Sequence, residues 1–309
     1  MSLSRRDLLG SSALAAFAQA ASPDSRIRLG ITTNTRGGWE SDVWLSFREA
    51  KEVGYRHVES FIHYFYKDYI DDPPALKARI EGMGLKFVTI SNGGPLEMQF
   101  EDPSKRSKLI DDHLRLIRLI KALGCTHLKI NLGGRRPQGT TSADLKEIAV
   151  TLNDLGKRIT DQGLKLCPHA HMWSQFENRR EIDYVMAHTD PRHVWFVLDT
   201  GHITMAGIDP VELVRTLGHR IVEFHMKDVD PRHRGGAKTR LERPDVMKDP
   251  PFFSLGKGGV DFPGIKTELD RIGWRGWMTV ELDSSPDRPP KEAARASRMY
   301  LESKLGLKA

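Results

Sequence analysis

Short apolar runs alternate with longer amphipathic segments along most of the chain. The longer segments carry apolar residues at helical spacing, most clearly over 106–123 and 142–162. The short runs are rich in β-branched and aromatic residues, which is typical of strands. They predict eight strands, at 28–33, 56–60, 86–91, 126–132, 165–170, 194–199, 221–227 and 277–283. Strands that alternate with helices in this way predict parallel βα units.

Glycine ends several of the predicted helices just before the next strand, as at Gly54, Gly84, Gly124, Gly163 and Gly273. Eight βα units favour a closed (β/α)8 TIM barrel over an open sheet, and no glycine-rich nucleotide turn follows the first strand. We therefore expect one barrel domain over residues 26–309. Its longest interruption, 230–261, is rich in Pro, Gly, Arg and Lys, and it predicts a functional loop.

The first 21 residues do not read as part of the barrel. Ser4-Arg5-Arg6 precedes an apolar run, and Ala18-Gln19-Ala20 supplies a small-residue cleavage site. This segment resembles a twin-arginine export signal, so we expect a periplasmic or extracellular protein. No later segment is long and apolar enough to span a membrane, so none is expected in the mature form.

Charge and cysteine content narrow the function only slightly. The net charge is +6 over 309 residues, and no sustained basic stripe with aromatic platforms appears, so a nucleic-acid partner is not expected. Cys125 and Cys167 lie in apolar surroundings, and we expect two buried free thiols. The sequence indicates no oligomeric state.

Polar residues gather at the C-terminal ends of the predicted strands, which in a barrel meet at one mouth. His169, Asp199, His225 and Glu281 lie on four consecutive strands. Two imidazoles with two carboxylates suit a divalent ion such as Mn²⁺, Co²⁺ or Zn²⁺. We therefore expect these four residues to share one divalent metal ion.

Further polar residues near the mouth are candidates for catalysis and for binding a sugar or keto-sugar. The candidate bases are Lys129, His171, His202 and Lys227, each on or just beyond a strand end. Lys129 is favoured, because a lysine inside a barrel strand is otherwise hard to explain, although a salt bridge to Glu59 explains it nearly as well. The expected substrate contacts are Glu59, which could instead orient a neighbour, Asn131 and Trp173.

Four segments carry a family resemblance: Val-Leu-Asp-Thr-Gly-His (197–202), Phe-His-Met-Lys-Asp-Val (224–229), Leu-Gly-Lys-Gly-Gly-Val-Asp-Phe (255–262) and Val-Glu-Leu-Asp (280–283). Together they resemble the xylose-isomerase-like barrel superfamily, which contains sugar isomerases and epimerases, inosose dehydratases and endonuclease IV. The resemblance implies that Asp199, His225 and Glu281 are metal ligands. It also implies that His202 lies beside the substrate.

One departure from the resemblance bears on the reaction. Strand five of the epimerases usually ends Glu-Asn-His, whereas this chain has His169-Ala170-His171. The change removes one of the two carboxylates that a two-base epimerisation needs, and it favours a lyase or dehydratase acting on a keto-glycoside or keto-inositol.

Three other functions are weighed against this one. Sugar isomerisation or epimerisation on the same metal is the main alternative, and a non-catalytic sugar-binding barrel is the next. Cleavage of DNA would need further metal ligands. At the corresponding positions this chain has Pro250 and Phe252, which cannot bind a metal.

Overall fold

The computed structural model describes residues 26–307, and the predicted leader over residues 1–21 lies outside that part of the chain. All eight predicted strands are present in their predicted order, within a few residues of the predicted bounds. They are β1 (Ile27–Thr32), β2 (His57–Phe61), β3 (Lys86–Ser91), β4 (His127–Ile130), β5 (Lys165–Pro168), β6 (Phe196–Asp199), β7 (Ile221–Met226) and β10 (Gly276–Val280). Every ladder between them is parallel.

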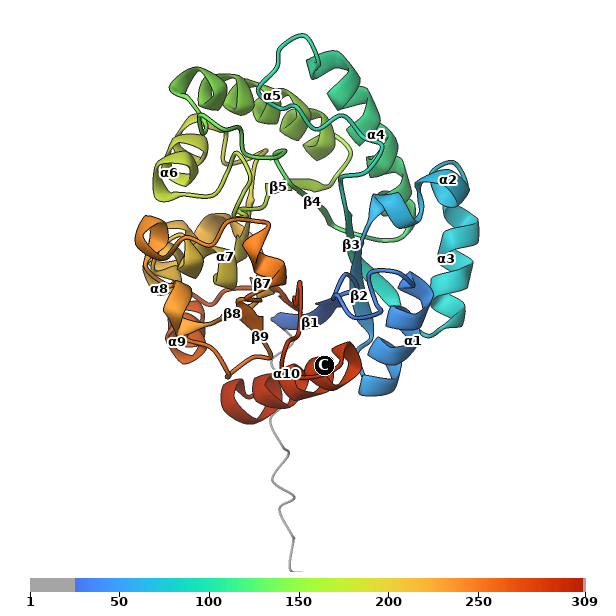
Figure 1. Ribbon diagram of the computed structural model, residues 1–309. Coiled ribbons are helices and arrows are strands. Elements are labelled where there is room, and N and C mark those ends of the chain that lie inside the picture. Colours follow the sequence, from blue (N-terminus) through green and yellow to red (C-terminus); the bar gives the residue numbers. More distant parts are fainter. Residues whose placement is uncertain (1–25, 308–309) are drawn as a thin grey trace, which may run out of the picture.

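The strands close into a ring (Figure 1). Six of them form one sheet in the order β3-β2-β1-β10-β7-β6, and β4 pairs with β5. Isolated parallel bridges, His169–Val197 among them, join β5 to β6. On the other side, the Asn92 side chain bonds the backbone of Asn131, accepting from its N–H at 2.8 Å and donating to its carbonyl at 3.1 Å. These contacts complete the predicted (β/α)8 barrel.

Helices surround the ring, and their apolar faces pack on the strands (Figure 1). The predicted helices over 106–123 and 142–162 are confirmed as α4 and α5. The five glycines expected to end helices all have positive φ. The helices are α1 (Val43–Val53), α2 (Tyr66–Tyr69), α3 (Pro73–Gly82), α4 (Arg106–Ala122), α5 (Ser142–Thr160), α6 (Arg179–His188), α7 (Thr200–Met205), α8 (Pro210–Leu217), α9 (Phe262–Arg271) and α10 (Pro290–Leu305).

The loop predicted over 230–261 folds back across the mouth of the barrel. Its flanks form a two-stranded antiparallel ladder of β8 (Asp228–Val229) and β9 (Phe252–Phe253). The Asp228 carboxylate accepts hydrogen bonds from three backbone N–H groups that follow β9, at 2.8–3.1 Å. A small apolar cluster beneath the loop, separate from the main core, is formed by Met172, Met205, Val229 and Phe252. The loop is thus held by packing and hydrogen bonds of its own.

The structure also shows the state of the two cysteines and the character of the helices. Cys125 and Cys167 are buried and unpaired, as predicted. Among the helices within residues 26–307, none has the length and apolar character needed to cross a membrane.

Candidate metal centre and active site

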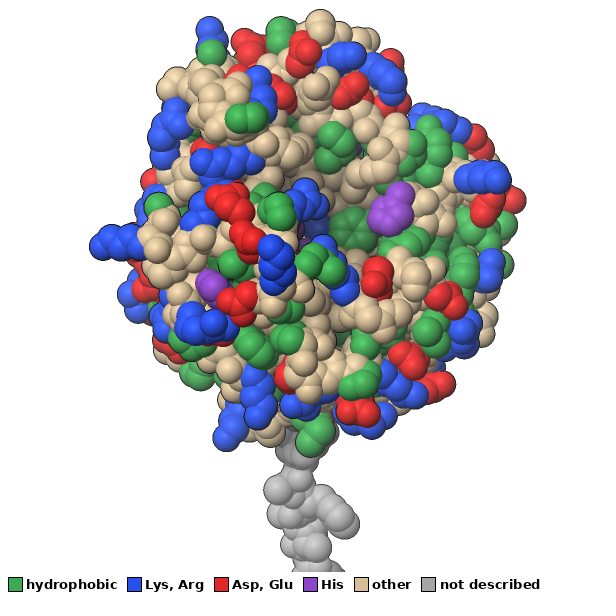
Figure 2. Space-filling view, viewed as in Figure 1, with side chains coloured by type: hydrophobic (Ala, Val, Ile, Leu, Met, Phe, Trp, Pro, Cys, Tyr) green, Lys and Arg blue, Asp and Glu red, His purple; other side chains and the backbone are tan. Residues whose placement is uncertain are grey.

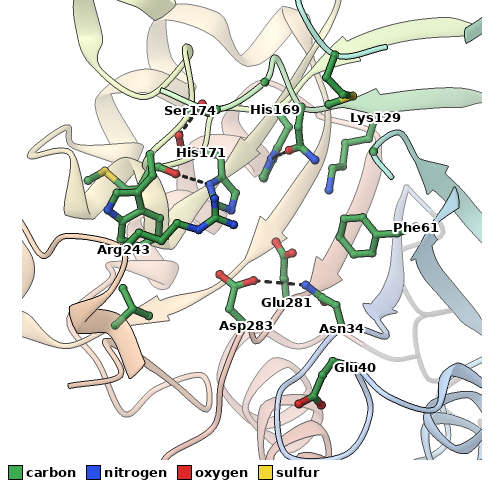
Figure 3. Close-up of a pocket in the computed structure, with 18 of the residues that line it drawn as sticks. Asn34, Glu40, Phe61, Lys129, His169, His171, Ser174, Arg243, Glu281 and Asp283 are labelled. Carbon is green, nitrogen blue, oxygen red and sulfur yellow. Dashed lines mark hydrogen bonds between the residues drawn. The ribbon is translucent and has the colours of Figure 1, made fainter. Parts of the chain in front are cut away.

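A cavity of about 520 Å³ opens at the C-terminal end of the barrel strands, and Figure 2 shows it as the hollow at the centre of that face. The loops after β1, β3, β4 and β5, the long loop between β8 and β9, and the segment after β10 contribute to its wall. Figure 3 shows Glu281 and Asp283 on one side of the cavity, with His169 and His171 across from them. The polar lining residues include Asn34, Arg36, Glu40, Lys129, Asn131, His169, His171, Arg243, Glu281 and Asp283.

The structure brings together the four predicted metal ligands. His169, Asp199, His225 and Glu281 are buried, and each offers a donor atom within 4.8 Å of the others. His169 Nε2, which has no hydrogen-bond partner, lies 3.5 Å from Asp199 Oδ2, an oxygen that also lies 3.0 Å from Lys227 Nζ. A buried polar atom without a partner is costly, so the unpaired His169 nitrogen beside a buried carboxylate indicates a ligand. A bound cation would satisfy both atoms.

Each of the two imidazoles has one nitrogen held by a partner outside the cluster. Asn131 Oδ1 lies 3.0 Å from His169 Nδ1, which leaves Nε2 facing Asp199. Glu59 Oε2 lies 3.0 Å from His225 Nε2, which leaves Nδ1 facing Glu281. Such outer partners fix the tautomer and orientation of metal-binding histidines. Glu59 is fully buried behind His225, which favours the orienting role over direct contact with a sugar hydroxyl.

The charge balance around the donors also fits a divalent ion. The ion-pair network through the cluster contains four carboxylates but only two ammonium groups. Burial raises the pKa of Asp199 to about 7, although nearby Lys227 opposes the shift. Burial would lower the pKa of His225, but Glu281 and Glu59 raise it to about 10. The upward shift of the His225 pKa comes from the carboxylates gathered around it, whose negative charge a divalent cation would neutralise.

Lys227 lies inside this network and not at the cavity wall. Its Nζ is 3.0 Å from Asp199 Oδ2, 2.9 Å from Asp283 Oδ2 and 2.9 Å from His202 Nε2. Burial would lower the pKa of Lys227, but the carboxylates raise it above its usual range. Lys227 is therefore an ammonium group, which corrects its expected role as a base.

Lys129 does line the cavity, but it is paired. Its Nζ lies 3.2 Å from Glu59 Oε1 and 4.9 Å from the centre of the Phe61 ring. Burial would lower the pKa of Lys129, but the Glu59 carboxylate raises it. The salt bridge that the sequence offered as the alternative is present, and it favours that explanation of Lys129 over a role as the preferred base.

His171 is the candidate base that reaches the cavity with a free nitrogen. Its Nδ1 lies 2.5 Å from the Met172 carbonyl, so Nδ1 carries the proton and Nε2 keeps its lone pair. Burial lowers the pKa of His171 to about 4, so the ring is neutral at pH 7. The His202 ring lies beneath it, with ring centres 3.7 Å apart, and is fully buried. His202 therefore supports His171 and does not form the wall itself.

The cavity wall also holds residues to which the sequence assigned no role. Asp283 lies two positions after Glu281 and accepts a hydrogen bond from Asn34 at 3.4 Å. Arg243 comes from the long loop and reaches the wall near His171 (Figure 3). Strand alternation after Glu281 gives a signal for Asp283, whereas nothing periodic marks Arg243. Trp173, one of the expected substrate contacts, lies at the wall as well.

Three known proteins are similar to this chain in sequence or in fold. An inosose dehydratase from Clostridium botulinum is 32% identical over 162 residues, which is 52% of this chain and 54% of that enzyme, so the match spans about half of its length. An inosose dehydratase from Geobacillus kaustophilus is 28% identical over 272 residues, covering 82% of this chain and 84% of that one. The structure of the IOLI protein with a zinc atom has a TM-score of 0.69 at 17% identity, with 89% and 96% covered.

A family model covers nearly all of the barrel. Residues 47–304 match the model described as a xylose isomerase-like TIM barrel. The matched region contains all four predicted metal ligands and the strands from β2 to β10. The chain therefore belongs to the xylose isomerase-like TIM barrel family.

Proposed function

We propose that this protein is a metal-dependent enzyme that removes a proton next to the carbonyl of a keto-sugar and eliminates the oxygen substituent at the β position. One observation carries the proposal. The free nitrogen of His171 lies at the wall of a sugar-sized cavity beside the donors His169 and Glu281. The two relatives named inosose dehydratase support the same class of reaction.

The cluster of His169, Asp199, His225 and Glu281 would hold the metal. A bound Mn²⁺, Co²⁺ or Zn²⁺ would act as a Lewis acid on the substrate carbonyl, which makes the neighbouring C–H more acidic. The nitrogen and oxygen donors suit all three ions.

The proton transfers fall to His171. Its Nε2 accepts the proton from the carbon next to the carbonyl, and the electron pair left behind forms a carbon–carbon double bond. The bond from the β carbon to oxygen breaks, and the departing oxygen takes the proton from the imidazolium. His171 thus returns to its neutral form. Lys129, an ammonium group on the same wall, can hold a substrate oxygen during these steps.

Epimerisation or isomerisation at the same centre is the second candidate. Asp283 lies across the cavity from His171 and would be the second proton-transfer group (Figure 3). Burial would raise the pKa of Asp283, but Lys227 holds it far below its usual range. Asp283 Oδ2 is already paired with the Lys227 ammonium group at 2.9 Å, so it is less available than His171 to exchange a proton with the substrate, which favours elimination.

Turnover in D₂O separates these functions. The protein would be loaded with Mn²⁺, Co²⁺ or Zn²⁺ and incubated with a keto-inositol and a 3-keto-glycoside, and products followed by NMR and mass spectrometry. Elimination predicts a product lighter by water or by the leaving alcohol. An isomer of the substrate that carries deuterium at the carbon that lost its proton would establish the second candidate, and binding without deuterium uptake or product would establish a binding barrel.

His171→Ala should lower the rate by at least about 100-fold, the usual contribution of a positioned base, while metal content is unchanged. His188→Ala is the matched control, because His188 is an exposed histidine on α6 that contacts Tyr184 far from the cavity. Equal rates for the two variants would contradict the role of His171.

A further inference from the structure

Trp173 has an unusual backbone conformation at the cavity wall. Its φ is 63°, the one positive value among the non-glycine residues over 26–307. Bulky residues avoid this left-handed region, so the surrounding structure must hold it there. Glu177 and Arg135 provide the contacts that hold it.

Glu177 holds the backbone of Trp173. The Trp173 N–H donates to Glu177 Oε2 at 2.5 Å, and the Trp173 carbonyl accepts from the Arg135 N–H at 2.8 Å. The Glu177 side chain is only 3% exposed and forms an ion pair with the Arg135 guanidinium. The buried carboxylate therefore holds the Trp173 N–H directly, and Arg135, with which it pairs, holds the Trp173 carbonyl.

The same carboxylate reaches the long loop over the mouth. Arg240 Nη1 donates to Glu177 Oε1 at 2.9 Å, and the Trp173 indole N–H donates to the Leu241 carbonyl at 2.8 Å. Trp173 and Leu241 also pack against the apolar cluster that contains Met172 and Phe252. The loop after β5 and the loop after β8 are thus joined through two residue pairs.

We infer that Glu177 is a positioning residue, which holds the Trp173 indole at the cavity wall and keeps residues 240–241 beside it. A neutral residue cannot replace it, because a single buried carboxylate balances two guanidinium groups. Trp173 then gives the cavity a fixed apolar face for a sugar or cyclitol ring. This inference rests on the proposed function only in placing the substrate in this cavity.

Limited trypsin digestion tests the loop contact without substrate. The segment 231–249 carries five cleavable sites, at Arg232, Arg234, Lys238, Arg240 and Lys248, because Arg243 is followed by Pro244. Glu177→Ala should raise the rate of cleavage within it at least tenfold. Glu242→Gln is the matched control, because Glu242 also pairs with Arg240 but is exposed, and it should digest like the unaltered protein. If Glu177→Ala does not fold, Arg240→Gln tests the same contact from the loop side.

Kinetics then test the positioning role. Glu177→Ala should raise KM about tenfold with kcat changed less than threefold and metal content unchanged, and Glu177→Gln should recover only part of the loss. Unchanged digestion in folded Glu177→Ala and Arg240→Gln would overturn the inference whether or not a substrate is known. Faster digestion in a protein that turns over no keto-sugar would contradict only the proposed function.

Discussion

At the scale of single residues, the centre depends on which nitrogen of each histidine is free. His169 and His225 both use one nitrogen for an outer partner, Asn131 and Glu59 respectively. The sequence predicts the donor types, because strand-end histidines and carboxylates are visible in it. It suggests that Glu59 could orient a neighbour, but it does not predict which histidine Glu59 or Asn131 contacts, since these residues come from β2 and from the segment after β4 and meet the histidines only in the closed barrel.

Removing an outer partner should weaken metal binding without removing a ligand. Asn131→Ala and Glu59→Gln should each lower the affinity for Zn²⁺ or Mn²⁺ by about 10- to 100-fold, because the imidazoles lose their fixed orientation. Titration with a competing chelator measures the affinity. Asn34→Ala is the control, since Asn34 lines the cavity and contacts Asp283 but no predicted ligand. Affinities equal to that control would argue against the orienting role.

At the scale of elements, the seam between β3 and β4 is held by side chains. Asn92 bonds the backbone of Asn131, and its amide nitrogen lies 3.0 Å from Nε2 of His113, a buried residue of α4. This explains why β4 ends at Ile130, before the predicted end at residue 132. The Asn131 backbone bonds a side chain there instead of a neighbouring strand, a contact that hydrophobic periodicity does not reveal.

The seam should make stability depend on pH. Burial lowers the pKa of His113 to about 4, below the usual value of 6.5. As the pH falls, His113 therefore takes up a proton in the unfolded chain before it does so in the folded protein. The free energy of unfolding is highest above pH 6.5 and decreases by up to about 3 kcal/mol as the pH falls toward 4.

Denaturant unfolding in EDTA between pH 4 and 6.5 measures this loss. The free energy of unfolding of His113→Gln should change less steeply with pH, by up to about 1.4 kcal/mol per pH unit. His188→Gln, at an exposed site, should follow the unaltered protein. Parallel curves for all three proteins would show that His113 does not titrate as expected.

At the scale of the whole molecule, the barrel follows from the sequence because its signals are local. Apolar runs, helical spacing and glycine stops each act within a few residues, and all eight strands lie where these signals place them. The extent to which each polar side chain is buried cannot be predicted from the sequence in the same way. Lys227 and His202 lie behind the wall and His171 forms part of it, because the loops after β5 and β8 decide which side chains are covered. The contact between Glu177 and Arg240 joins residues 63 positions apart in sequence, so local patterns do not predict it either.

The central claim is a mononuclear metal centre, and metal content tests it most directly. The purified protein would be compared with His225→Ala and Glu281→Ala by elemental analysis after loading with Mn²⁺, Co²⁺ or Zn²⁺. We predict about one divalent ion per chain in the unaltered protein and its loss in both folded variants. No bound metal in the folded, loaded protein, or equal metal content in all three proteins, would contradict the account.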